Sequence, residues 1–495
     1  MESLTARVLR SSILLMLMRL LQRSIGLISM LILARVLVPE DFGLIAIVAL
    51  IVHFCDGMAN TGTQHYIAQK GHVSEDDLNT AWTLDIIIRV VLWIAVILLA
   101  PMLSVFFERT ELENALIVAS FMLPIAAANN PKFLMLRREL NYNPIFKVTV
   151  AQRLFSFAAT MGYLWIDQSF WALVVGDLTS ALVMALGSYY VTPHKPRLGL
   201  KSVVEQWRFT RWTLLRAIVG YIRGQFDVFL TTRFYLPADI GAYHVTRSIS
   251  VMPVSEVIGP ATEPLIAAFA KAKDDPDTLA HRISLSALVI VGLAFPAAAF
   301  MWTFPQVLVD FFLGEQWTGA DLILQALTPL IVAFIVSSAA GQCLVALGKV
   351  RELFIFEMTS TVLAFSTLLY FRQDTVAEFA ALRSAVGIFT AVIACLYVSQ
   401  FVRINGGRMV LMALPLAALS ALAAYITHFV LGGVHINVVV DLASRLSLFG
   451  ILMLGGLSSL YFIVYRHSRE GQAIADIAIS RAEPLLQKVR ARSRR

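Results

Sequence analysis

Long apolar segments recur along almost the whole of this 495-residue chain and constrain its fold more than any other feature. The hydrocarbon core of a bilayer is about 30 Å thick and needs about 20 apolar residues per helix. The sequence therefore predicts an all-α polytopic membrane protein with about 14 transmembrane helices. These spans are placed at 11–33, 43–66, 79–104, 113–135, 146–166, 168–190, 209–232, 241–270, 282–305, 320–346, 352–371, 376–401, 409–431 and 438–465.

Lysine and arginine are distributed unevenly between the two sides of these spans. With the N-terminus in the cytoplasm, the loops on the opposite side hold four of the 40 basic residues, namely Arg35, Arg109, Arg233 and Arg372. Because cytoplasmic loops are enriched in Lys and Arg, we expect a multi-pass protein of the bacterial inner membrane with both termini cytoplasmic. The net charge of +7 and the basic tail at 466–495 then follow from topology and from anionic lipid head groups. We expect no nucleic-acid partner.

An internal repeat divides the chain. Four residues after the first span recur 198 residues later, after the seventh: Arg35, Pro39, Asp41 and Gly43 as Arg233, Pro237, Asp239 and Gly241. A second echo pairs 138–140 with 351–353. In the repeated loop, proline ends one helix, aspartate caps the next and glycine permits a tight turn.

The repeat predicts two six-helix lobes with the same membrane orientation, related by an axis along the membrane normal, plus two C-terminal helices. The predicted N-lobe is 1–195 with spans 1–6, and the C-lobe is 196–401 with spans 7–12. Spans 13 and 14 occupy 402–465, and the cytoplasmic tail is 466–495. Two lobes around a central cavity are typical of an alternating-access transporter.

Charged residues inside the spans indicate the kind of cavity. Each one costs about 2.5–3.5 kcal/mol at a helix centre, so it faces water, pairs with an opposite charge or reaches the surface. Arg19 and Arg23 share one helix face, with no acid near them on that helix. With Arg89 and Arg223 they are the candidate ligands for a pyrophosphate, because the arginine fork donates two hydrogen bonds to phosphate oxygens.

Two interpretations of the deep acids stay open. They serve ion coupling, to H⁺ or Na⁺, or they form salt bridges to the arginines; Asp85 and Arg89, like Arg223 and Asp227, are four residues apart. These acids are Asp56, Asp85, Asp177, Asp227 and Glu256. Arginines nearer the span ends are expected to reach the surface by snorkelling: Arg153, Arg216, Arg247, Arg383 and Arg445.

The sequence offers no catalytic constellation. It has no GxxxxGK[ST] nucleotide loop and no metal-ligand spacing, so we expect neither enzyme activity nor a cofactor. The pairs Asp76–Asp77 and Asp274–Asp275 are interpreted as solvated loop charges rather than the metal ligands of a glycosyltransferase. The predicted external loops are about ten residues or fewer, which is short for a membrane polymerase acting on glycan.

Several short motifs resemble one family. The chain resembles the polysaccharide-exporter branch of the multidrug/oligosaccharidyl-lipid/polysaccharide flippase superfamily, especially colanic-acid-exporter-like proteins. The motifs are 33–44, 67–70, 136–141, 268–271 with Asp274 and Asp275, and 314–317. The resemblance implies a two-lobed fold. It also implies movement of undecaprenyl-pyrophosphate-linked oligosaccharide repeats from the cytoplasmic to the periplasmic leaflet, for exopolysaccharide, capsule or O-antigen assembly.

Two alternatives remain beside that interpretation. One is an ion-coupled multidrug or metabolite antiporter of the same fold, and the other is a membrane glycosyltransferase or polymerase. The partners expected of a flippase are the lipid bilayer, a polyprenyl-pyrophosphate-linked glycan and the polysaccharide polymerase or export machinery. We expect it to act as a monomer.

Overall fold

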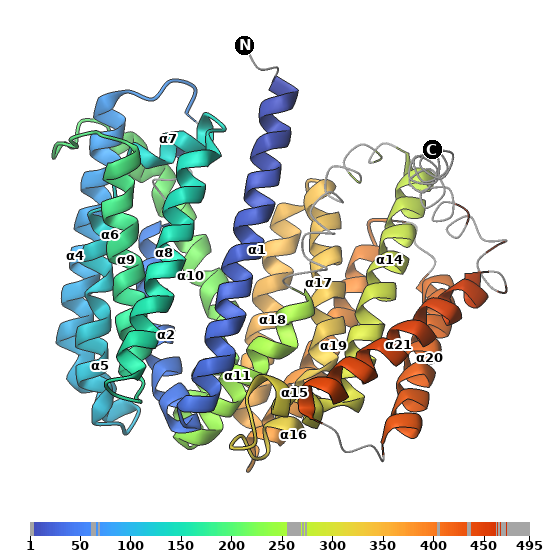
Figure 1. The fold of residues 1–495 in the computed structure, drawn as a ribbon. Coiled ribbons are helices and arrows are strands. Elements are labelled where there is room, and N and C mark those ends of the chain that lie inside the picture. Colours follow the sequence, from blue (N-terminus) through green and yellow to red (C-terminus); the bar gives the residue numbers. More distant parts are fainter. Residues whose placement is uncertain are drawn as a thin grey trace, which may run out of the picture. The chain divides into compact units, whose positions relative to one another are not determined.

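The computed structural model describes residues 4–60, 66–67, 70–254, 269, 272, 275–402, 406–432 and 437–461, with 463, 466 and 472 as isolated positions. Every regular element in these ranges is a helix (Figure 1). Contacts divide the chain into two compact units, Met1–His244 and Val245–Arg495, called unit 1 and unit 2 below. The lobe boundaries at 195/196 and 401/402, and the tail from 466, stay predictions.

Unit 1 is a bundle of long helices (Figure 1). In it α8 packs on α9, α1 on α8, α2 on α10, and α4 on α5 and α6. Its helices are α1 (Leu4–Val36), α2 (Pro39–Asn60), α4 (Glu75–Phe106), α5 (Glu111–Ser120), α6 (Met122–Ala127), α7 (Phe133–Arg138), α8 (Tyr142–Leu164), α9 (Trp171–Val191), α10 (Val203–Phe234) and the start of α11 (Pro237–Pro253).

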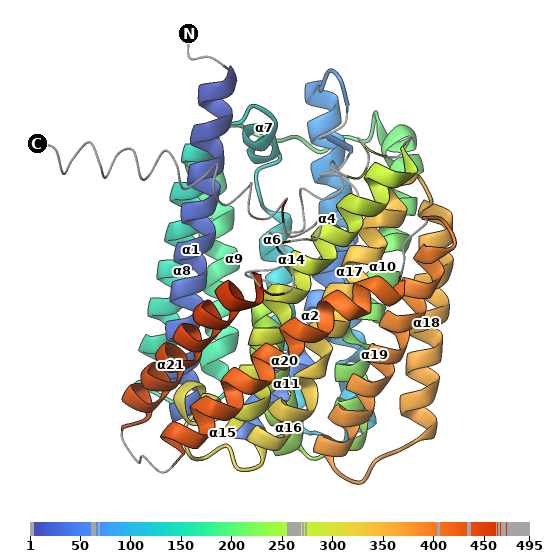
Figure 2. The ribbon, with the colours of Figure 1, turned by 90° about the vertical axis from the view of Figure 1, so that its right-hand side faces the viewer.

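Unit 2 contains a second helical group. In it α17 packs on α19 and α14 on α20, while α20 and α21 run obliquely to α18 (Figure 2). Its helices are α14 (Pro276–Thr303), α15 (Pro305–Phe312), α16 (Ala320–Leu327), α17 (Pro329–Ala346), α18 (Val350–Tyr370), α19 (Val376–Ser399), α20 (Gly406–Leu431) and α21 (Val438–Leu460).

Ten helical segments of the described ranges are long and apolar enough to cross a membrane. The predicted class, an all-helical polytopic membrane protein, is confirmed, while the number 14 stays a prediction. The expected span 113–135 is divided into α5 and α6, because Pro124 has no N–H to continue the helical hydrogen bonds. The expected span 209–232 lies inside α10, which carries Arg211, Arg216, Arg223 and Asp227 and is too charged to count among the ten.

The two repeated loops meet within unit 1. A side chain at Gly43 would collide with the backbone carbonyl of Pro237, and one at Gly241 with that of Pro39. Such reciprocal contact is what a two-fold relation between copies produces. The expectation that these glycines permit a tight turn is wrong: both lie inside helices, and what they permit is close backbone approach. The capping role of Asp41 is confirmed, because its carboxylate Oδ2 accepts the Val38 N–H at 3.4 Å.

One aspartate of each loop pair caps a helix. Asp77 is 2% exposed, not solvated as expected, because it closes a capping box with Ser74 at the start of α4. Asp275 caps α14, where donation from the Thr278 hydroxyl at 2.6 Å lowers the pKa of its carboxyl. Asp274 lies outside the described residues. Asp77 and Asp275 are thus engaged in capping helices, while Asp76 forms an exposed salt bridge with Lys201 at 3.1 Å.

Two arginines expected to snorkel are buried instead. Arg445 is 7% exposed; its Nε donates to Asp441 Oδ1 at 2.6 Å and its guanidinium lies 5.1 Å from the Phe304 ring centroid. Arg383 is also 7% exposed and lies 5.7 Å from the Phe334 ring centroid. A carboxylate one turn away and aromatic faces replace the water that snorkelling would have supplied.

Candidate transport site

Arg89 of α4 is the centre of a buried charged cluster between α2 and α4. Its Nη1 donates to Asp56 Oδ1 at 2.5 Å, and its Nε donates to Asp85 Oδ2 at 3.0 Å. Arg89 is 1% exposed, whereas the Asp56 side chain is 27% exposed. The salt bridge between Asp85 and Arg89 expected from their spacing is present, and Asp56 joins it from the neighbouring helix. Through these two bonds Arg89 joins α2 to α4.

A second group of charged side chains lies on α2, α8 and α9. Asp177 of α9 interacts electrostatically with His53 of α2 and Arg153 of α8. All three side chains are exposed although they lie well inside long helices. Charged groups at such positions in a membrane protein face a water-filled cavity or the bundle interior. Arg153 therefore belongs to this polar surface, and the sequence argument did not single out His53.

Close packing of α8 on α9 fixes the positions of Arg153 and Asp177. The Ser156 hydroxyl donates to the Gly176 carbonyl at 2.9 Å, and the Gln152 amide donates to the Ser180 hydroxyl at 2.9 Å. A side chain at Gly176 would collide with the Thr160 hydroxyl. Small residues and hydroxyl hydrogen bonds of this kind hold membrane helices together, so α8 and α9 form a closely packed helix pair.

Arg19 and Arg23 lie on α1, which packs on α8. Arg19 is exposed and Arg23 is half-buried. Four residues of spacing places both guanidinium groups on one side of α1. They add two cations to the helix bundle that already holds Arg153. Of the four predicted pyrophosphate ligands, two are exposed, Arg19 and Arg223.

The two members of the expected pair on α10 differ in exposure. Arg223 is exposed, whereas Asp227 is fully buried and accepts a hydrogen bond from the Tyr243 hydroxyl at 3.1 Å. Tyr243 lies on α11 and is itself fully buried, so Asp227 joins α10 to α11. Glu256 lies outside the described residues.

Two of the short family motifs contact each other near the start of α4. The Arg138 guanidinium donates to the carbonyls of Ile67, at 3.3 Å, and Gly71. Lys70 binds Asp77 at 2.9 Å and Glu205 of α10 at 3.2 Å. Donation to the Tyr66 hydroxyl and to Asp77 raises the pKa of Lys70. These motifs hold α4, α7 and α10 together, which is a structural role.

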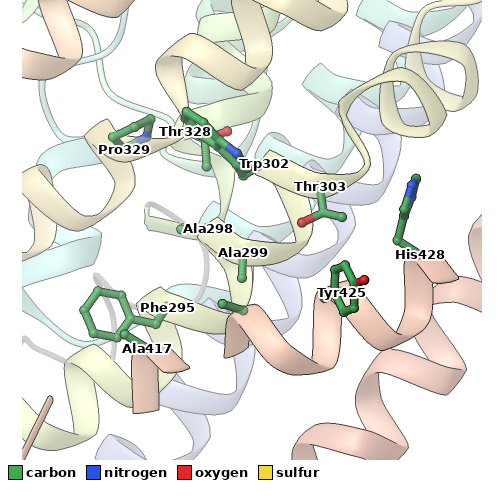
Figure 3. Close-up of a pocket in the computed structure, with 11 residues that line it drawn as sticks. Phe295, Ala298, Ala299, Trp302, Thr303, Thr328, Pro329, Ala417, Tyr425 and His428 are labelled. Atoms are coloured by element: carbon green, nitrogen blue, oxygen red, sulfur yellow. The ribbon is translucent and has the colours of Figure 1, made fainter. Parts of the chain in front are cut away.

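Unit 2 contains a cavity of a different chemical kind. It has a volume of about 560 Å³ and lies where α14, α17 and α20 meet (Figure 3). Phe295, Trp302 and Ala417 contribute apolar surface, while Tyr425 and His428 of α20 lie at one side of it. No lysine, arginine, aspartate or glutamate lines this cavity, so it suits an apolar chain better than a charged head group.

Long apolar helices with charged side chains held inside a bundle define a multi-pass membrane transport protein. Residues 32–322, more than half of the chain, match the family model described as polysaccharide biosynthesis protein. The chain belongs to this family, and its resemblance to the polysaccharide-exporter branch is confirmed.

Named relatives agree with that assignment. The chain is 25% identical over 349 residues to the lipopolysaccharide biosynthesis protein WzxC of Escherichia coli K12, covering 68% of this chain and 70% of WzxC. It is 22% identical to the succinoglycan biosynthesis transport protein ExoT of Rhizobium meliloti, covering 58% and 59% of the two chains.

Solved structures show the same fold. The lipid II flippase MurJ in an inward closed conformation superposes with a TM-score of 0.71 and 14% identity, covering 92% of this chain and 99% of MurJ. An inward-facing multidrug transporter of the MATE family gives a TM-score of 0.60 with 14% identity, covering 79% and 95%. Relatives and neighbours are transport proteins and flippases, which confirms the prediction that the chain is not an enzyme.

Proposed function

We propose that this protein flips undecaprenyl-pyrophosphate-linked oligosaccharide repeats from the cytoplasmic to the periplasmic leaflet of the bacterial inner membrane, for exopolysaccharide, capsule or O-antigen assembly. Membership of the polysaccharide biosynthesis family supports the substrate class, as do the names of WzxC and ExoT. The uneven distribution of Lys and Arg supports cytoplasmic termini.

One observation carries the proposal to particular residues: guanidinium groups lie exposed or half-buried in the middle of long helices of unit 1. Arg19, Arg23 and Arg153 lie on the packed pair α1 and α8, and Arg223 lies on α10. Each would cost about 2.5–3.5 kcal/mol against lipid. A pyrophosphate that enters the bundle replaces water around these cations with charge-assisted hydrogen bonds.

The proposed mechanism separates the two ends of the substrate. The pyrophosphate and sugars bind the polar surface of unit 1, while the polyprenyl chain stays in the hydrocarbon region. Alternation of the two units then exposes the head group to each side of the membrane in turn. The arginines lower the free-energy barrier to translocation. They stabilise the pyrophosphate at the membrane depth where transfer of an unpaired anion would cost most.

A deletion strain of the native host tests the function. We expect complete but unpolymerised lipid-linked repeats to accumulate, shielded from a periplasmic glycan-modifying probe. Incomplete repeats would indicate a glycosyltransferase, and repeats that reach the periplasm normally would indicate export of something else. Either outcome contradicts the flippase proposal.

Complementation of that strain tests the anion site. Arg19→Ala/Arg23→Ala should lower export by about 10-fold or more, since each lost charge-assisted hydrogen bond is worth about 1.5–3 kcal/mol. Arg137→Ala removes an exposed arginine at the end of α7 and should export normally. Full export by the double variant at normal membrane level would overturn the assignment to these arginines and leave the flippase proposal standing.

A further inference from the structure

The segment that joins α9 to α10, residues 192–202 and called the linker below, follows the first turns of α4. The main-chain N–H of Arg197 donates to the Asn79 side-chain oxygen Oδ1 at 2.9 Å. Two residues further on, the Gly199 N–H donates to the Thr83 hydroxyl at 3.0 Å. Asn79 and Thr83 are four residues apart and share one face of α4, so the linker is bound along that face.

Both ends of the linker are held through main-chain groups as well. At its start, the Asn130 side-chain amide donates to the Thr192 carbonyl at 2.6 Å. At its end, the Ser202 N–H donates to the Thr80 hydroxyl at 3.3 Å. Because all these bonds use main-chain groups of the linker, they fix its path without using its side chains.

These contacts place the linker at the edge of the hydrocarbon region. Its partners on α4 lie in the first turns of the expected span 79–104. Helix α10 has 32 residues and is about 48 Å long at 1.5 Å per residue, whereas the hydrocarbon core is about 30 Å thick. The first turns of α10, which precede the expected span 209–232, therefore extend into the layer of lipid head groups.

The linker and the first turns of α10 expose apolar side chains at this depth. The exposed fraction is 73% for Leu198 and 71% for Val204. Leu200 and Trp207 are each 46% exposed. Gln206, in contrast, is fully buried, and its amide donates to a main-chain carbonyl of α4 at 2.9 Å. Helix α10 thus turns one face to α4 and the opposite face, with Val204, outward.

The same stretch of chain is strongly basic. Residues 192–211 contain five Lys and Arg and one acid, Glu205. Glu205 already binds Lys70 at 3.2 Å. All five basic side chains are exposed, namely Lys195, Arg197, Lys201, Arg208 and Arg211. Exposed Lys and Arg beside exposed Leu and Trp are typical of segments that lie in the membrane interface.

We propose that the linker and the first turns of α10 bind anionic phospholipids. The head-group phosphate lies on the basic side chains, while the leucines and Trp207 pack on the upper part of the acyl chains. In the proposed orientation this surface faces the cytoplasmic leaflet, which is the leaflet with a negative surface potential. The inference concerns the lipid around the protein and does not depend on the substrate that the protein moves.

The apolar side chains favour a lipid over an acidic protein as the occupant. Bonds to Asn79 and Thr83 hold the linker where head groups meet hydrocarbon, so Leu198 and Val204 contact lipid there without any further partner. A soluble acidic protein that approaches from water pairs with the basic side chains but covers the apolar ones only by displacing lipid. Charge and apolar surface together therefore fit an anionic phospholipid.

The emission of Trp207 in nanodiscs tests the proposal, because bromine on a lipid quenches a tryptophan that it contacts. The signal of Trp207 is the difference between each protein and the same protein with Trp207→Phe. The discs are phosphatidylcholine with a minority of either brominated phosphatidylglycerol or brominated phosphatidylcholine. We expect the brominated phosphatidylglycerol to quench Trp207 more strongly at the same mole fraction.

Variants without two of the cations should lose this preference. Arg197→Ala/Arg208→Ala should lower the affinity for phosphatidylglycerol relative to phosphatidylcholine by about 10-fold or more, since each basic side chain near the surface contributes about 5-fold. Arg197→Ala keeps the main-chain bond to Asn79, so the linker stays in place. Arg197→Lys/Arg208→Lys should keep the preference, because the surface recognises phosphate by its charge.

A matched control removes two exposed arginines of unit 2. Arg351→Ala/Arg372→Ala lowers the net charge equally and should keep the preference of Trp207 for phosphatidylglycerol. Equal quenching by the two brominated lipids in the wild type overturns the inference, and so does a Trp207 that neither lipid quenches. A preference that survives in Arg197→Ala/Arg208→Ala, or that the control also loses, overturns the assignment to this surface. The discs contain no transport substrate, so the result is independent of the flippase proposal.

Discussion

The first turns of α2 and its last turns differ in what they contact. At the start, Gly43 lies against the backbone of Pro237, and the Asp41 carboxylate accepts N–H groups of Val38 and Phe170. Toward the end, His53 and Asp56 interact with charged groups of α9 and α4. One end is held by backbone contact and the other by charge.

The difference shows how one helix can combine fixed and adjustable contacts. Backbone contacts through glycine have one geometry and no dependence on protonation. Charged contacts change with each proton or anion that binds. A helix anchored at one end and charged at the other can respond at its charged end while its register stays fixed.

Removal of Arg89 should disrupt the charged end of α2 and have the largest expected effect on stability. Arg89→Leu leaves Asp56 and Asp85 without the guanidinium that binds both, and loss of one partner of a buried ion pair costs about 3–5 kcal/mol. We expect a large fall in folded protein at the membrane and in the thermal midpoint of the purified protein in detergent.

A charge-balanced variant sharpens this result. Asp56→Asn/Arg89→Leu/Asp85→Asn removes all three charges together and should recover most of the lost stability, because replacement of a whole buried ion cluster is often close to neutral. If Arg89→Leu alone is as stable as wild type, the cluster does not hold α2 to α4.

The backbone end should respond to side-chain size. Gly43→Leu places a side chain where the Pro237 carbonyl lies, and overpacking of this kind costs about 1–3 kcal/mol. Gly26→Leu is the matched control, since nothing lies within 4 Å of a Cβ at that position of α1. Equal thermal midpoints for the two variants would contradict the close contact of the repeated loops.

The sequence predicted the helical class and the repeated loops, and it predicted the salt bridge between Asp85 and Arg89 from their spacing. It did not predict Asp56 as the second partner of Arg89, because that contact joins α2 to α4 and depends on how the two helices rotate. His53 was missed for the same reason: its neighbours Asp177 and Arg153 are more than 90 residues away in the chain. The signal available was His53 one turn before Asp56 inside an apolar segment.

The prediction for Gly43 and Gly241 was wrong because glycine has two possible roles here, a tight turn or a close backbone contact. Gly43 and Gly241 match in sequence, and a glycine after Pro and Asp commonly supplies a turn. The structure uses their lack of a side chain instead, for contact between the two copies of the loop. Only the partner surface decides between a turn and a close approach, and that surface comes from the other repeat.

The smallest expected effect compares the two copies of the capping aspartate. Asp239 accepts a hydrogen bond from the Leu236 backbone, as Asp41 does from Val38, but Asp41 Oδ1 also accepts the Phe170 N–H at 3.2 Å. Loss of a cap costs about 1 kcal/mol. Asp41→Ala should therefore lower the thermal midpoint more than Asp239→Ala, because it also removes the second hydrogen bond, which is worth about 0.5–1.5 kcal/mol of stability. Equal thermal midpoints for the two variants would mean that water takes the place of the Asp41 carboxylate as acceptor for the Phe170 N–H. The backbone end of α2 would then depend on its glycine contact alone.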